Sequence, residues 1–272
     1  MRNYGLKIEE QKPEDYVFGG ASPVPFDILQ PNGDWTDYTP EKELQSPNGF
    51  ESYACATFAT LNAIETLIFK QYGIKENFSD RFLAAASGTK EGGNSPHVVA
   101  EYIRKVGLIL EGEYPYTKDI DTFQKYYGPI PPKLYEIARE FLDKYDFLHE
   151  YVTPIAPSIE EALTSSPLGV SVYAWVFKDG KYIHPQGVTD NHWVLMTKWN
   201  KDSFTVFDTY SDGPDASVCK EVAFDYMPAI IKRYWIQKKE VAQPIEHLTE
   251  GNWLTDILKN LWEFIRDILW QK

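Results

Sequence analysis

Apolar residues in the first half of the chain recur at the spacing of a helix. Between residues 58 and 68 they return every three or four positions, at Phe58, Leu61, Ile64, Leu67 and Ile68. This period predicts a long helix with one buried face, preceded by a turn. The residue at the expected start of this helix is a cysteine, Cys55.

A second helix is predicted after the polar turn region at residues 87–96. Asn94 or Ser95 would cap it, Pro96 would take its first position, and it would run to about Gly107. Two further helices are expected, at residues 133–145 and from residue 158 to just before residue 167.

The period changes to that of strands in the second half. β-branched and aromatic residues dominate four short segments, at residues 168–176, 193–197, 204–207 and 229–236. Helices first and strands afterwards predict an α+β fold, not alternating β-α units.

The two ends of the chain differ from its middle in amino-acid composition. Residues 1–30 are rich in Pro, Gly and acidic residues, which is typical of an extended arm laid over a core, and residues 239–251 resemble a linker. The last segment has apolar residues on one side and predicts an amphipathic helix. We therefore expect an N-terminal arm at residues 1–30, a main domain at 31–238, a linker at 239–251 and a C-terminal helix at 252–272.

Composition narrows the class of protein. The 272 residues carry a formal net charge of −13, which argues against a nucleic-acid groove. No apolar run is long enough for a transmembrane helix, and the first residues lack the apolar core of a signal peptide. Two cysteines, Cys55 and Cys219, require no oxidising compartment. We expect a cytoplasmic protein of a bacterial host, or one packaged into a virion.

Three residues in this order suggest nucleophilic catalysis. Cys55 stands at a helix start, where the helix dipole favours a thiolate, although a buried structural cysteine is the alternative. His192 directly precedes an apolar strand, and Asp208 ends the next one. A histidine that opens one strand and an aspartate that closes its neighbour can face each other, as a base and its orienting group do.

Several ordered motifs resemble those of papain-like cysteine peptidases. The segment Cys55-Ala56-Thr57-Phe58-Ala59 is similar to the family's Cys-Trp-Ala-Phe-Ala, and Asn191-His192-Trp193-Val194-Leu195 to its Asn-His-Ala-Val-Leu. Three more landmarks match the family's Gly-Gly, Tyr-Pro-Tyr and Asn-Ser-Trp segments: Gly92-Gly93, Tyr114-Pro115-Tyr116 and Asp208-Thr209-Tyr210. Outside these motifs, the sequence resembles divergent members of the family from bacteriophages and prophages.

The resemblance implies a fold and a set of roles. It implies a helical half and an antiparallel β-barrel-like half with the active site between them. Cys55 would be the nucleophile, His192 its base, and Asp208 the residue that orients the imidazole in place of the family's Asn. The oxyanion hole would use a side-chain amide, for which Gln45 is the first candidate and Asn48 the second. The charge of Asp208 is expected to favour the protonated ring.

The resemblance also assigns a substrate cleft, lined by Gly92, Gly93 and Asn191. The expected activity is hydrolysis of a peptide or isopeptide bond in a protein or peptide substrate, through a thioester and without metal or organic cofactor. Two alternatives stay open: a catalytically inactive structural or binding component of a phage particle, and a cell-wall peptide hydrolase. The C-terminal helix could pair with a second copy or dock on a protein surface.

Overall fold

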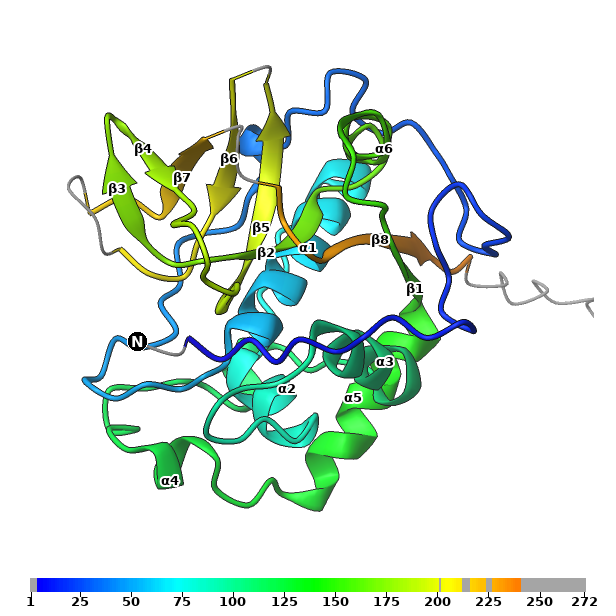
Figure 1. Ribbon diagram of the computed structural model, residues 1–272. Helices are drawn as coiled ribbons and strands as arrows, with labels where there is room; N and C mark the ends of the chain where they lie inside the picture. The colour runs from blue at the N-terminus through cyan, green and yellow to red at the C-terminus, as the bar shows by residue number, and fades with distance from the viewer. Residues whose placement is uncertain (1–3, 201, 212–215, 224–226, 241–272) are drawn as a thin grey trace, which may run out of the picture. The chain divides into compact units, whose positions relative to one another are not determined.

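The computed structural model describes residues 4–200, 202–211, 216–223 and 227–240. The linker and amphipathic helix predicted for residues 241–272 lie outside these residues. The described part has the predicted α+β organisation, with helices concentrated in the first half of the chain and strands in the second (Figure 1).

One helix lies at the centre of the structure. Helix α1 has every residue from Cys55 to Ile68 buried, so the predicted single buried face was too narrow. It packs against α3 on one side and against strands β5 and β8 on another. Ser95 caps α3 as predicted, and the short α2 and α4 were not foreseen. The helices are α1 Cys55–Tyr72, α2 Asp80–Ala86, α3 Pro96–Val106, α4 Phe123–Tyr126, α5 Pro132–Lys144 and α6 Ala156–Leu163, with 3₁₀ turns at Thr36–Tyr38 and Glu111–Glu113.

The strands form one sheet in the order β1-β8-β2-β5-β6-β7-β4-β3. The pairs are antiparallel except β4 with β7, which meet in parallel. The order ends at β1 and β3, so the sheet is not closed and the expected barrel-like half is an open sheet. The strands are β1 Tyr145–Tyr151, β2 Leu168–Val172, β3 Val176–Lys178, β4 Lys181–Ile183, β5 His192–Trp199, β6 Ser203–Phe207, β7 Cys219–Ala223 and β8 Ile231–Lys238.

The N-terminal arm crosses the structure in an extended conformation. In Figure 1 it runs between the strands β2–β7 and the helices α2–α5. Leu6 forms a parallel bridge with Asn94, and Val17 forms one with Tyr151 of β1. The arm is therefore tied to both halves of the fold along its length.

Among the described residues, no helix combines the length and the apolar character needed to cross a membrane.

Candidate active site

Cys55 is the first residue of α1, at the junction of a tight turn and the central helix. Tyr53, two residues earlier, has a φ of 57°, a left-handed conformation that turns the chain into the helix axis. No side chain caps the helix start. The thiol is fully buried, and the neighbouring main chain of Trp193, the residue after His192, favours its ionised form. Cys55 thus lies beside the first residues of β5.

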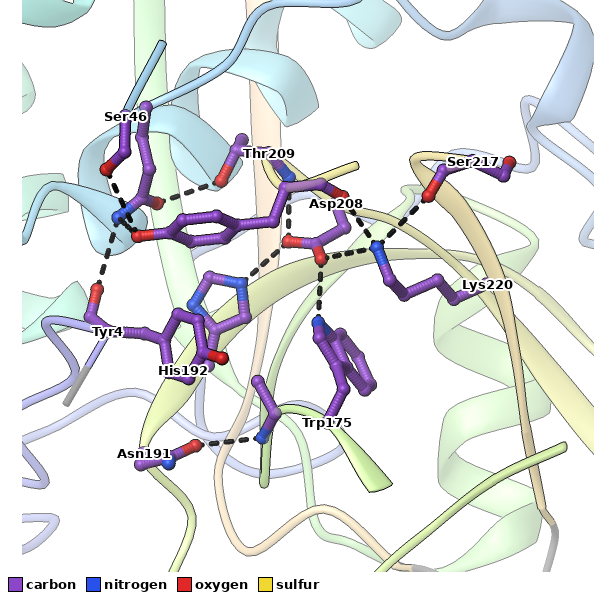
Figure 2. A network of polar contacts seen from close by, with 12 residues as sticks. Tyr4, Ser46, Trp175, Asn191, His192, Asp208, Thr209, Ser217 and Lys220 are labelled. Carbon is purple, nitrogen blue, oxygen red and sulfur yellow. Dashed lines mark hydrogen bonds and ion pairs between the residues drawn. The ribbon is translucent and has the colours of Figure 1, made fainter. Parts of the chain in front are cut away.

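His192 and Asp208 face each other across neighbouring strands. His192 begins β5, and Asp208 directly follows the last residue of its antiparallel partner β6. His192 Nε2 lies 2.6 Å from Asp208 Oδ1, and both side chains are fully buried (Figure 2). The other ring nitrogen, Nδ1, has no hydrogen-bond partner. It is the nitrogen left to exchange a proton with a thiol.

Two residues that the sequence analysis missed also hold Asp208. Its Oδ2 accepts hydrogen bonds from Trp175 Nε1 at 2.8 Å and from Lys220 Nζ at 2.8 Å (Figure 2). Burial would raise the pKa of the Asp208 carboxyl, but the His192 ring and the Lys220 ammonium outweigh it and lower that pKa to about 2. Asp208 is therefore ionised throughout the working pH range of an enzyme.

The amide of Gln45 lies next to this pair. Thr209 Oγ1 donates to Gln45 Oε1 at 2.8 Å, and this bond orients the amide. Gln45 Nε2 then faces three acceptors, which are the Tyr210 hydroxyl at 2.6 Å, the Glu51 carboxylate at 3.0 Å and the carbonyl of Tyr4 at 3.2 Å. Asn48, the second candidate, uses its amide nitrogen to bind two carbonyl oxygens of the loop at residues 117–120. Of the two candidate amides, Gln45 is the one that contacts both the N-terminal arm and Thr209, the residue after Asp208.

The residues assigned to the substrate cleft contact the N-terminal arm. Asn191 O accepts a hydrogen bond from Tyr4 N at 3.3 Å. Gly93 packs so closely on Gly5 that any side chain at residue 93 would collide with the Gly5 carbonyl, and Gly92 precedes it with the same left-handed backbone. Residues 4–7 of the arm thus occupy the position between the candidate cleft residues.

Solved structures show which fold this arrangement belongs to. Xylellain, a cysteine protease from Xylella fastidiosa, superposes with a TM-score of 0.62 at 16% identity, covering 89% of this chain and 98% of its own. Bromelain from Ananas comosus superposes with a TM-score of 0.54 at 19% identity, covering 76% of this chain and 97% of its own. Procathepsin L 3 of Tenebrio molitor superposes with a TM-score of 0.56 at 17% identity, covering 85% of this chain and 76% of its own. The chain has the papain-like cysteine protease fold. No protein-family model and no curated protein sequence matches it.

The papain-like fold accounts for the placement of the candidate site on a central helix and two neighbouring strands. The identities are too low to carry an activity across. These three proteins come from a bacterium, a plant and an insect, and the phage context suggested by the sequence texture stays a prediction.

The surroundings of Cys55 and His192 are more buried than the sequence led us to expect. The ring of Tyr4 lies with its centroid 5.1 Å from that of His192, and Tyr4 itself is almost fully buried. Burial, followed by the charge of Glu51, raises the pKa of the Cys55 thiol, and the helix start does not compensate. Burial thus disfavours the thiolate in this arrangement of the arm, and the thiolate expected from the helix start stays a prediction.

Proposed function

We propose that this chain is a cysteine peptidase that hydrolyses peptide or isopeptide bonds, and that its own N-terminal arm keeps it latent. The observation that carries the proposal is the contact between Gln45 Nε2 and the Tyr4 carbonyl, 3.2 Å apart. The amide to which the family resemblance assigns the oxyanion hole thus already binds a peptide carbonyl, and Gln45 also contacts Thr209, the residue after Asp208.

In the open state, each group has one task. His192 Nδ1 removes the proton of Cys55, and the thiolate attacks the substrate carbonyl carbon. The Gln45 amide stabilises the resulting oxyanion. The ring then gives its proton to the leaving amine as the C–N bond breaks, which leaves a thioester. A water molecule, activated by the same ring, attacks the thioester carbon, the C–S bond breaks and the thiol is restored.

Asp208 keeps the ring in place during both steps. Its Oδ1 accepts the hydrogen bond of Nε2–H, which fixes the tautomer and stabilises the imidazolium that forms transiently. Because the carboxyl stays ionised, this support is present at any pH at which peptidases work.

Substrate enters only when the arm leaves. Tyr4 uses the amide of Gln45 and the carbonyl of Asn191, and a substrate peptide would need the same groups. Departure of the arm also exposes Cys55 to water, which lowers the cost of forming the thiolate.

Labelling with E64, the inhibitor found in the bromelain complex, tests the proposal. We expect slow labelling of the full chain and fast labelling of a chain lacking residues 2–7, at Cys55 as located by mass spectrometry. His192→Ala in the shortened chain should abolish fast labelling, and Cys219→Ser should leave it unchanged because the side chain of Cys219 is exposed, whereas that of its neighbour Lys220 is buried.

Casein and peptide-library cleavage by the shortened chain would then identify the substrate. If the shortened chain folds but neither labels nor cleaves, the alternative of a catalytically inactive structural protein replaces the proposal. Cleavage of cell-wall peptides alone would instead favour the cell-wall hydrolase.

A further inference from the structure

We propose that Lys220 is a positioning residue of the candidate site, which balances the charge of Asp208 and reserves Oδ1 of that carboxylate for His192. The inference rests on the proposed function and adds a fourth polar member to its Cys–His–Asp set.

The contacts of Lys220 are those of a fixed cation. Its side chain is fully buried, and Nζ donates to Asp208 Oδ2 at 2.8 Å, to the carbonyl of Tyr210 at 2.6 Å and to that of Ser217 at 3.1 Å (Figure 2). The ammonium also lies 5.4 Å from the centre of the Trp175 ring. Three acceptors in these directions hold Nζ in one place.

The two oxygens of Asp208 have separate partners. Oδ2 receives Lys220 and Trp175, whereas Oδ1 receives His192 and the main-chain N–H of Thr209 at 2.7 Å. With four donors around it, the carboxylate cannot rotate without losing a hydrogen bond in a buried place. The ring of His192 therefore meets one oxygen in one direction.

The charge balance follows from the same contacts. The family's Asn at this position would offer His192 a neutral acceptor, but Asp208 offers a charged one. In the part of the chain that the structure describes, Lys220 and His192 are the only basic groups within ion-pair distance of Asp208. With Lys220 paired to it, the carboxylate still accepts the ring's hydrogen bond, and its pull on a ring proton is reduced.

Other titratable groups near the ring come from other elements, and one of them is Tyr4 of the N-terminal arm, whose ring centroid lies 5.1 Å from that of His192. Cys55 lies on α1, and Glu51 and Tyr210 lie in loops, where the Tyr210 hydroxyl donates to the Glu51 carboxylate at 2.6 Å. None of them contacts Asp208 in the way Lys220 does. The effect of Lys220 can thus be isolated by changing residues 208 and 220 together.

A double-mutant cycle tests the inference in the full-length chain. NMR follows the pH at which the His192 ring is half-protonated, in wild type, Lys220→Met, Asp208→Asn and the double variant. We expect this midpoint to rise by at least about one pH unit in Lys220→Met, the lower end of the effect of a nearby buried charge. It should fall in Asp208→Asn, and the double variant should return it toward the wild-type value.

Lys232→Met is the matched control, because Lys232 is another fully buried lysine but packs on the ring of Tyr151. It should leave the midpoint unchanged. If Lys220→Met does not fold, Asp208→Asn and the double variant still decide. Equal midpoints in those two would overturn the inference, as would a Lys220→Met midpoint equal to that of wild type.

The ring titration needs no peptidase activity, so its result is independent of the labelling experiment. In the shortened chain, the rate of E64 labelling against pH gives a second readout. If the chain is labelled at Cys55 as expected, but the titration midpoint of the His192 ring does not depend on residue 220, only the role of Lys220 is refuted. A chain that never labels would refute the proposed function and leave the electrostatic coupling to be measured.

Discussion

Two glycines allow the arm to pass between the candidate cleft residues. Gly5 has a φ of 108° and Gly93 a φ of 94°, a region that side chains disfavour. A Cβ on Gly5 would collide with the carbonyl of Tyr53, which belongs to the turn before the nucleophile. The closed state thus depends on the absence of a side chain at residue 5.

Gly5→Ala should therefore open the site. We expect iodoacetamide to modify Cys55 about 5- to 150-fold faster than in wild type, since loss of roughly 1–3 kcal/mol of arm docking shifts the closed–open equilibrium by that factor. The reaction is measured with Cys219 replaced by Ser.

Gly19→Ala is the control for this experiment. Gly19 lies in the same arm with a φ of 80°, but a Cβ there would meet nothing within 4 Å. It should leave the rate at Cys55 near that of wild type. Equal rates in all three proteins would mean that residues 4–7 do not limit access to the thiol.

Lys232 gives a second prediction at the scale of one residue. Burial lowers the pKa of its ammonium to about 7, and several carboxylates, Asp15 first among them, offset part of this. Between about pH 7 and 10.5 the unfolded chain therefore binds a proton that the folded one does not. Stability from this group rises with pH over that window and is lost as pH falls through it.

We expect Lys232→Met to stabilise the protein most at pH 7, with the gain shrinking by roughly 1 kcal/mol per pH unit toward pH 10. Urea unfolding of both proteins at pH 7, 8 and 9 measures the difference. A gain independent of pH would show that Lys232 is charged in the folded state.

At the scale of elements, strands β1 and β8 share a buried ion pair. Arg233 Nε donates to Glu150 Oε1 at 2.6 Å, and the guanidinium also binds Ser165 Oγ and the carbonyl of Pro25. Both side chains are almost fully buried. The pair therefore joins the sheet to the N-terminal arm.

Replacing Glu150 by Gln would leave the arginine charge buried without its partner. We expect a loss of about 3–5 kcal/mol in the free energy of unfolding, measured with urea. Asp121→Asn is the comparison, because its pair with Lys125 is exposed and its removal should be undetectable. A similar result for both variants would show that burial does not strengthen the role of Glu150.

The elements also show what sequence can and cannot predict. Helix α3 was predicted because its start is encoded locally, by Ser95 and Pro96. Strand β1 was missed because it follows helix α5 at once, with no turn residues between Lys144 and Tyr145, and its partner β8 is distant in sequence. The β-rich segment 168–176 was expected as one strand, but it is divided between β2 and β3.

The candidate site also contains residues that the sequence could predict and a residue that it could not. Cys55, His192 and Asp208 could be proposed because each stands at the end of an element with a readable pattern. Lys220 could not, because a lysine in a polar strand is normally exposed and only the position of Asp208 explains its burial. In β7, residues 220 and 222 are buried and their neighbours are not. The alternation of inward and outward side chains along a strand was therefore the one available signal that Lys220 is buried.

At the scale of the whole molecule, the arm and the site belong to one chain. A tethered segment acts at an effective concentration on the order of mM, independent of dilution. We expect E64 labelling of the full chain to be equally slow across a hundredfold dilution. Labelling that accelerates on dilution would indicate that the arm of one copy closes another copy.

The predicted C-terminal helix makes a separate prediction for the assembly. Its apolar positions 254, 257, 261, 264 and 268 follow the spacing of helix pairs. We expect deletion of residues 251–272 to lower the oligomeric state, as measured by light scattering. An unchanged oligomeric state would remove self-association and leave docking on a protein surface.

The way the arm is held has a consequence for how its sequence could change over evolution. Its four hydrogen bonds in the cleft, to Asn191, Gln45 and twice to Asn94, all use main-chain atoms of residues 4–7. Main-chain groups are the same in almost every amino acid, so substitutions in the arm would leave these bonds intact. Gly5 is the exception, and the ring of Tyr4 also packs against that of His192. An arm held in this way can drift in sequence while it keeps its length and Gly5.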